Sequence, residues 1–203
     1  MILLHFCSNS RAQRVLWLLE ELKLKYEINK IKFHPSELKS EEHKKKHPLG
    51  RVPVLEDDNI VLFESGAIIE YIIAKYDNKD LKPNSEDTLF PVYLQWYHYC
   101  EGMVMPPMNT IVVHTIILSE ERRNPEVLRQ AKNLLTKAIT PIEELLSKNK
   151  FLIRDQISGV DFMLGHALYM ANKLGCVSDN MKNILRYVVL IKSMKSFEIA
   201  INT

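Results

Sequence analysis

The spacing of apolar residues changes once along this chain of 203 residues, near residue 80, and that change limits the folds that the chain can adopt. Before residue 80, short apolar runs typical of strands alternate with stretches of helical spacing. After it, only helical spacing recurs, over longer stretches. We therefore predict an α/β module over residues 1–79, followed by an all-helical module over residues 85–203.

In the first module the predicted elements alternate between strand and helix. Strands are predicted at 2–6, 26–33, 53–56 and 60–63, with helices at 10–22 and from 65 onward. Residues 36–46 are polar and rich in lysine, and form a short solvated helix at best. Asp57-Asp58-Asn59 predicts a β-hairpin, and Ser10 with Gln13 predicts a capping box that starts the first helix. The order β-α-β, crossover, β-β, α is that of a thioredoxin-like fold.

Proline residues divide the second module. Pro106-Pro107 interrupts the apolar-periodic stretch 89–118 and predicts a kink there. Asn124-Pro125 predicts an N-cap followed by proline at the first helical position, and Pro141 should bend the helix that follows. Further helices are predicted at 158–174, 180–192 and 194–201.

The composition excludes several classes of protein. With 27 basic and 25 acidic residues, the net charge is +2, which gives no basic surface for nucleic acid. The apolar run Met1-Ile2-Leu3-Leu4 is shorter than the roughly 7–15 residues of a secretory signal, and no segment approaches the roughly 18 of a membrane span. Cys7, Cys100 and Cys176 are odd in number and far apart, which favours a reducing compartment. We expect a soluble, cytoplasmic protein without a nucleic-acid or membrane partner.

One pair of histidines has the spacing of a metal site. His43 and His47 stand at i, i+4, as in a helical metal-binding pair. Lys44-Lys45-Lys46 lies between them and would repel a cation. We therefore predict no bound metal.

Five short motifs follow one another along the chain: SNSRAQRVLWLLEEL at 8–22, HPLGRVPVL at 47–55, ESGAI at 64–68, EGMVMPP at 101–107 and SGVD at 158–161. In this order they resemble the cytosolic glutathione S-transferases over essentially the full length. The first motif resembles the bacterial and fungal subgroup typified by the yeast microsomal-associated enzyme. Each motif is weak alone, but five in the right order are specific. We expect Ser158 and Asp161 of the last motif to form a structural capping box and to take no part in catalysis.

The resemblance implies a thioredoxin-like N-terminal domain (βαβ-α-ββα), followed by an all-α C-terminal domain. It also implies a detoxifying transferase that conjugates the thiolate of its cosubstrate glutathione to a hydrophobic electrophile, without a metal. Two alternatives on the same scaffold remain open: a glutathione-dependent reductase of disulfides or peroxides, and a non-catalytic glutathione-binding module.

Two adjacent residues at a predicted helix start are candidates for the γ-glutamyl end of glutathione. Ser65 lies where free backbone N–H groups and the helix dipole favour an anion, here the γ-glutamyl carboxylate. Glu64 beside it would pair with the ammonium group. The alternatives are a plain N-cap for Ser65 and a solvated acid near a positive helix end for Glu64.

The loop before the third strand supplies the other binding candidates. Base rates alone favour a trans bond before Pro53, whereas the resemblance implies a cis bond. That bond would turn the N–H and C=O of Val52 toward the cysteinyl backbone of glutathione. Arg51 is a candidate for the glycine carboxylate, its alternative being one more exposed cation.

The thiol of glutathione needs a hydrogen-bond donor to ionise, because its ordinary pKa is about 8.5. The resemblance places this donor in the turn after the first strand, which contains no tyrosine. The candidates are Ser10, then Asn9, then Ser8. For Ser10, the capping box is an equal alternative, and Cys7 is expected to end a buried strand.

The resemblance further implies a homodimer. Phe63 and the apolar segment 89–94 lie where dimers of the family make contact. Together they would form a large apolar patch on a monomer, where a two-fold contact is the default. The alternative is that both segments fold into the seam between the two modules.

Overall fold

The computed structural model describes residues 1–203, which divide into two compact units. Met1–Leu81 with Lys192–Thr203 form the first unit, and Lys82–Ile191 form the second. The sequence placed residues 85–203 in one helical module. In the structure, helix α10 (Lys195–Asn202) packs within the first unit instead.

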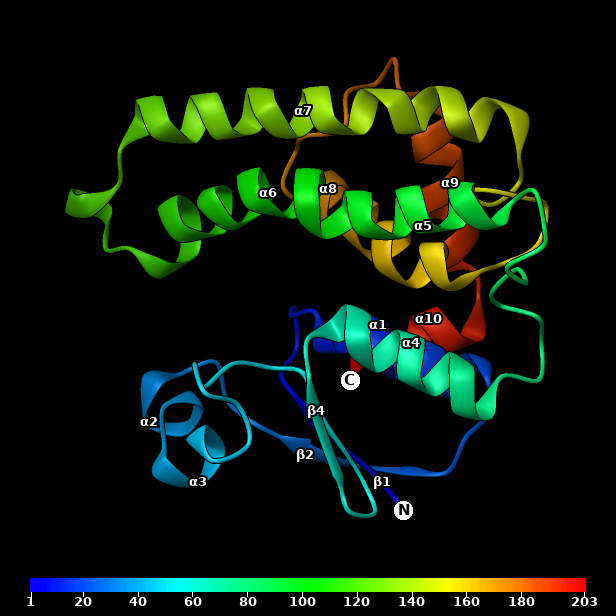
Figure 1. Ribbon diagram of the computed structural model, residues 1–203. Coiled ribbons are helices and arrows are strands. Elements are labelled where there is room, and N and C mark those ends of the chain that lie inside the picture. The colour runs from blue at the N-terminus through cyan, green and yellow to red at the C-terminus, as the bar shows by residue number, and fades with distance from the viewer. The chain divides into compact units, whose positions relative to one another are not determined.

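The first unit is built on a four-stranded sheet of order β2-β1-β3-β4 (Figure 1). The strands are β1 (Ile2–Phe6), β2 (Tyr26–Lys30), β3 (Val54–Asp57) and β4 (Ile60–Phe63). β1 runs parallel to β2 and antiparallel to β3, and β3 pairs with β4 as the predicted hairpin, with Val54 opposite Phe63. The predicted thioredoxin-like topology is therefore confirmed.

Three helices lie on one side of this sheet (Figure 1). They are α1 (Ala12–Glu21), α4 (Ser65–Tyr76) and α10. The predicted apolar stripe of α4 is buried, at Ile68, Ile69, Ile72 and Ile73. α1 is buried along most of its length because α10 packs against it: the rings of Trp17 and Phe197 lie 4.6 Å apart, edge to face.

The predicted capping box at the start of α1 is not formed. α1 begins at Ala12, whose N–H donates to the hydroxyl of Ser10 at 3.1 Å. The side chain of Gln13 is buried and points instead to the carbonyl of Ile201 in α10, at 3.5 Å. Because α10 packs against α1, a distant segment supplies a partner of the Gln13 side chain.

The residues between β2 and β3 form two short helices, α2 (Pro35–Leu38) and α3 (Glu41–Lys44). The prediction of a solvated segment over 36–46 was wrong in part, since His43 is buried, as is His47 just after it. On the sheet, buried His5 bonds through Nε2 to Glu56 at 2.6 Å. Lys46, just after α3, forms an ion pair with the same carboxylate, which joins this segment to the sheet.

The second unit opens with a nearly continuous helical stretch. It consists of α5 (Phe90–Tyr99), a π-helical turn η1 (Cys100–Val104), α6 (Met105–Val112) and a second π-helical turn η2 (Val113–Ile117). Pro106 and Pro107 have no N–H to offer the carbonyls of Gly102 and Met103. The predicted interruption therefore takes the form of a π-helical turn just before the two prolines.

The remaining helices follow the predicted boundaries closely. They are η3 (Glu120–Arg122), α7 (Pro125–Lys148), η4 (Asp161–Gly165), α8 (His166–Lys173) and α9 (Lys182–Lys192). Asn124 caps α7 as predicted, since its Oδ1 accepts the N–H groups of Glu126 and Val127 at 3.0 and 3.2 Å. α7 continues unbroken through Pro141. None of the helices is both long and apolar enough to cross a membrane.

Asp161 is the centre of a buried hydrogen-bond network in the second unit. Its carboxylate accepts the N–H and hydroxyl of Ser158 at 2.8 and 2.9 Å, the N–H of Leu152 at 3.1 Å and the hydroxyl of Tyr187 at 2.8 Å. Burial raises the pKa of Asp161, while these hydrogen bonds oppose the shift. The network is the structural cap that the sequence predicted.

Candidate functional site

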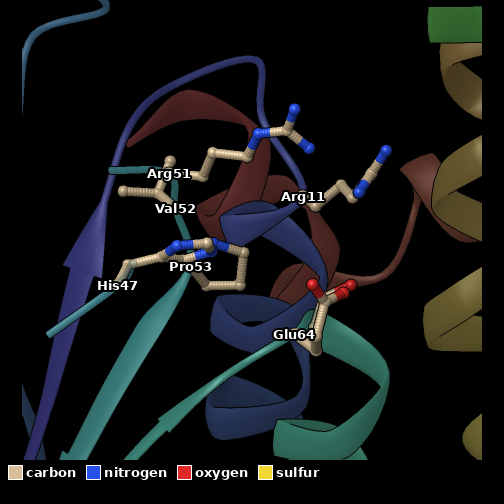
Figure 2. Close-up of a pocket in the computed structure, with 7 residues that line it drawn as sticks. Arg11, His47, Arg51, Val52, Pro53 and Glu64 are labelled. Atoms are coloured by element: carbon tan, nitrogen blue, oxygen red, sulfur yellow. The ribbon is translucent and has the colours of Figure 1, made fainter. Parts of the chain in front are cut away.

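A pocket in the first unit brings together residues from three separate segments (Figure 2). These segments are the residue just before α1, the loop between α3 and β3, and the start of α4. The pocket is lined by Arg11, His47, Arg51, Val52, Pro53, Glu64 and Ser65. All five residues predicted to bind glutathione therefore line one pocket, together with two that the sequence reasoning missed.

The loop before β3 presents free backbone groups to the pocket. The bond between Val52 and Pro53 is cis, as the resemblance implied. Val52 precedes the first residue of β3, and its N–H and C=O have no backbone hydrogen-bond partner. An extended peptide could pair with these groups as an added strand does.

Two neighbours hold this loop in place. Nε2 of His43 donates to the carbonyl of Arg51 at 2.8 Å. Gly50 has a left-handed φ of +53°, and a Cβ there would lie 2.1 Å from the carbonyl oxygen of Leu38. Only glycine fits at this close approach, which explains the glycine in the sequence motif.

The start of α4 combines a strained residue with a helix N-terminus that lines the pocket. Glu64 has φ 72° and ψ 113°, a conformation that non-glycine residues rarely adopt and that often marks a functional site. Its side chain is exposed and makes no capping hydrogen bond. Ser65 is the first helical residue, not the cap that the alternative interpretation predicted. The backbone N–H of Ser65 has no backbone partner and therefore remains available to an anion.

A buried guanidinium lies next to this helix start. Arg14 in α1 is fully buried, and its Nη1 donates to the hydroxyl oxygen of Ser65 at 3.2 Å. The sequence reasoning missed Arg14. The one indication in the sequence was its position as a charged residue inside an apolar helical stretch. A buried charge is costly unless it is paired or hydrogen-bonded. Its charge adds to the helix dipole in favouring an anion at Ser65.

The remaining charges of the pocket are mainly positive. Arg11 and Arg51 extend their guanidinium groups from its rim, and Glu64 is its only carboxylate (Figure 2). A ligand that carries two carboxylates and one ammonium group matches this distribution of charge. The one indication in the sequence that Arg11 belongs to the site was its position inside the first motif, at 8–22.

His47 forms part of the pocket wall. The residue is only 5% exposed, and its ring lies 4.8 Å from the ring of Phe63. Its Nδ1 accepts the N–H of Leu49 at 3.1 Å. Burial lowers the pKa of His47, although the charge of Glu64 opposes this shift. In the sequence analysis, the only role considered for His47 was that of a metal ligand. In the structure, no group of three or more His, Cys, Asp or Glu side chains is arranged to hold a metal ion.

None of the three predicted thiol donors lines the pocket. Ser8 and Asn9 are exposed, and Asn9 adopts a left-handed φ of 57°. The hydroxyl of Ser10 donates to the carbonyl of Cys7 at 2.6 Å, so its proton is used within the turn. Cys7 is buried, and burial, with the charge of Glu37, raises the pKa of its thiol. The sulfur of Cys7 is therefore not a preformed thiolate.

The comparisons with known proteins agree with this arrangement. The family described as "Glutathione S-transferase, N-terminal domain" matches residues 1–74, and "Glutathione S-transferase, C-terminal domain" matches residues 104–191. Glutathione S-transferase 1 of Saccharomyces cerevisiae is 30% identical over 84% of this chain and 81% of its own. Glutathione S-transferase 3 of Schizosaccharomyces pombe is 29% identical over 98% and 86%, respectively. The crystal structure of a glutathione S-transferase from Actinobacillus pleuropneumoniae superposes with a TM-score of 0.81 at 27% identity, covering 98% of this chain and 91% of that one.

Proposed function

Because the chain belongs to the glutathione S-transferase family, we propose that it is a glutathione transferase that conjugates the glutathione thiolate to an electrophilic small molecule. The observation that carries this proposal is the pocket. It combines an anion-favouring helix start, a carboxylate, an unpaired strand-like backbone and two rim cations within one unit.

The γ-glutamyl end of glutathione binds at the start of α4. Its carboxylate accepts hydrogen bonds from the N–H groups of the first helical turn, beside the hydroxyl of Ser65 and above the buried Arg14. Its ammonium pairs with the carboxylate of Glu64. Closing this contact removes the exposed Glu64 from water, which strengthens the ion pair.

The rest of the tripeptide extends along the loop before β3. The cysteinyl N–H and C=O pair with the unpaired C=O and N–H of Val52. The glycine carboxylate then reaches Arg51 on the rim. This orientation directs the thiol toward the turn between β1 and α1.

The bound thiol loses its proton to solvent, and the thiolate attacks the electrophilic carbon. A carbon–sulfur bond forms as the leaving group departs with its electron pair. Lowering the thiol pKa by about two units requires about 2.7 kcal/mol of preferential thiolate stabilisation. The turn donor, the N-terminus of α1 and the charge of Arg11 together supply it.

We assign the donor to the turn 8–10. Ser10 reaches the thiol only if its hydroxyl turns away from the Cys7 carbonyl. The exposed amide of Asn9 carries two N–H groups in the same turn and is the first candidate. Ser8, also exposed, is the third.

We also assign the chain to the bacterial and fungal subgroup typified by the yeast microsomal-associated enzyme, and place it in the cytoplasm as a detoxifying homodimer. Exposed apolar residues support the dimer. In the first unit, Ile60, Val61 and Phe63 of β4 are exposed. In the second, Met103 and Leu134 are exposed and line an apolar groove beside Pro106 and Pro107.

Comparing two substrates tests the proposed activity. With purified protein and glutathione, we expect turnover of chlorodinitrobenzene to exceed turnover of hydroxyethyl disulfide. The reverse order would instead support a glutathione-dependent reductase. Glutathione binding by calorimetry without turnover of either substrate would indicate a non-catalytic binding module.

A further inference from the structure

A single carboxylate oxygen ties the α2–α3 segment (residues 35–50) to the sheet. Oε1 of Glu56 in β3 accepts the Nε2–H of His5 in β1 at 2.6 Å and also binds the ammonium group of Lys46, which follows α3. His5 is 2% exposed, and the side chains of Lys46 and Glu56 are each 26% exposed. One anion therefore serves two nitrogen groups in a largely buried position.

The neighbours of His5 favour its neutral ring. Nε2 carries the proton because Glu56 is an acceptor, and the amide nitrogen of Asn29 in β2 lies 3.0 Å from the unprotonated Nδ1. The ring of His43 in α3 lies 5.9 Å away. Burial lowers the pKa of His5, and Lys46 and His43 lower it further, although Glu56 opposes the shift. Asn29, Glu56, His43 and Lys46 are thus the polar groups that act on this ring from β2, β3 and the α2–α3 segment.

A proton on His5 upsets the charge balance of this cluster. While His5 is neutral, the charges of Lys46 and Glu56 cancel. Protonated His5 brings a second positive charge to the same carboxylate, where little water is present to solvate it, and such a charge is costly. Its Nδ1–H also faces the amide nitrogen of Asn29, which is itself a donor. Moving the α2–α3 segment away from the sheet removes Lys46 and admits water to His5, so protonation favours this opening.

The same segment supports the loop of the pocket. Nε2 of His43 donates to the carbonyl of Arg51 at 2.8 Å, and the N–H of Gly50 donates to the carbonyl of His47 at 2.7 Å. The side chain of His47 also lines the pocket. Opening of the segment therefore releases the contacts that position Val52 for an extended peptide.

We propose that His5 is the proton sensor of a pH-dependent switch, in which its protonation releases the α2–α3 segment from the sheet and disassembles the pocket. The consequence for glutathione rests on the proposed function, whereas the opening of the segment does not. In the open form the ring regains its ordinary pKa of 6.5, which is higher than in the closed form. The closed form is therefore favoured at neutral pH and loses stability as pH falls below 6.5.

Amide hydrogen exchange measures this opening without any ligand. The N–H groups of Lys44 and His47 donate to the carbonyls of Ser40 and His43, so they report on α3. We expect their opening constant, corrected for the intrinsic exchange rate at each pH, to rise about four- to eightfold between pH 7.0 and pH 5.5. A constant that does not rise in the unmodified protein would overturn the switch, whether or not any variant folds.

Three substitutions identify the sensor. His5→Gln retains a donor for Glu56 but cannot be protonated, so its opening constant should change less than about twofold over the same range. His98→Gln, an exposed histidine in α5, is the matched control and should retain the full rise. Thermal denaturation checks that each variant folds. If the rise persists in His5→Gln and disappears in His43→Gln, the sensor is His43 and the proposal is wrong.

Glutathione tests the link between the segment and the pocket. A ligand that binds only the closed form lowers the opening constant, and the carboxylates of glutathione stay ionised between pH 5.5 and 7.0. We therefore expect saturating glutathione to slow exchange at Lys44 and His47 at both pH values. Binding seen by calorimetry without slower exchange would disconnect the switch from the pocket. If glutathione does not bind at all, the proposed function fails, while the exchange of the free protein still decides the switch.

Discussion

Arg14 and Ser65 are 51 residues apart in sequence, yet the buried guanidinium of Arg14 donates to the Ser65 hydroxyl at 3.2 Å. This bond joins α1 to the first turn of α4, where the pocket begins. It places a fixed positive charge beside the first residue of that turn. The fold thereby prepares an anion site before any ligand binds.

Ser65→Ala should weaken glutathione binding and also destabilise the protein. The substitution removes the acceptor of a buried Arg14 N–H, a loss that costs about 1–3 kcal/mol. Urea denaturation measures the stability, and calorimetry measures the binding. Ser147→Ala, an exposed serine in α7, serves as the control and should change neither. Unchanged binding in Ser65→Ala would remove this serine from the site.

Glu64→Gln should weaken glutathione binding by about 1.5–3 kcal/mol, the range for a hydrogen bond to a charged group. The substitution keeps the shape of the side chain but removes the charge that pairs with the ammonium. Glu86→Gln, an exposed acid in the second unit, should leave the affinity unchanged. Calorimetry at one ionic strength compares the two, and equal affinities for both variants would refute the assignment.

Asn9→Ala should raise the pKa of the bound glutathione thiol more than Ser10→Ala does. The hydroxyl proton of Ser10 is already donated to the Cys7 carbonyl, whereas the Asn9 amide lies exposed in the same turn. The thiolate absorbance near 240 nm, followed against pH, reports the shift. Ser10→Ala should instead cost about 0.5–2 kcal/mol of stability, because its Oγ also accepts the Ala12 N–H. A larger pKa shift in Ser10→Ala would transfer the role of donor to Ser10.

Stability should fall in acid through Asp57. Burial alone would raise the pKa of Asp57, but hydrogen bonds from Lys75, Tyr76 and Tyr71 lower it from 3.8 to about 2. A carboxyl whose pKa is depressed by folding contributes stability above its unfolded pKa and loses it as pH falls through the folded pKa. The loss should total about 2 kcal/mol between pH 5 and pH 2.

The measurement is the free energy of unfolding in urea at a series of pH values. Asp57→Asn retains an amide oxygen that can accept hydrogen bonds but cannot ionise, so it should lose about 2 kcal/mol less than the unmodified protein over this range. Parallel pH profiles for the two proteins would show that Asp57 is not the group responsible.

Phe63→Ser should weaken the proposed dimer. Phe63 on β4 is 40% exposed beside other exposed apolar residues, so its removal takes apolar area from the contact. Light scattering should give about twice the 23.7 kDa of one chain for the unmodified protein and a lower mass for the variant. Val189→Ser, an exposed apolar residue in α9, should leave the mass unchanged. A mass near that of one chain for the unmodified protein, holding as concentration rises, would contradict the dimer.

Features that depend on neighbouring residues were predictable from the sequence. The turn at Asp57-Asp58-Asn59, the isoleucine stripe of α4 and the Asn124 cap all appear as predicted. Five of the seven pocket residues were also predicted, because short motifs carried the resemblance that named them. The cis bond before Pro53 came from the resemblance alone, since its base rate favours trans.

The tertiary structure alone decided which distant segments meet. In the sequence, α10 is one more amphipathic helix, and only its contact with Trp17 shows that it belongs to the first unit. The same helix provides a hydrogen-bond acceptor for Gln13, which the sequence had assigned to a capping box. His47 follows three lysines and looks solvated in the sequence, yet it is buried in the pocket wall. Periodicity and capping are encoded within a few residues, so the sequence expresses them directly. Burial and the partner of a polar atom depend on chain segments far apart in sequence, which only the folded arrangement brings together.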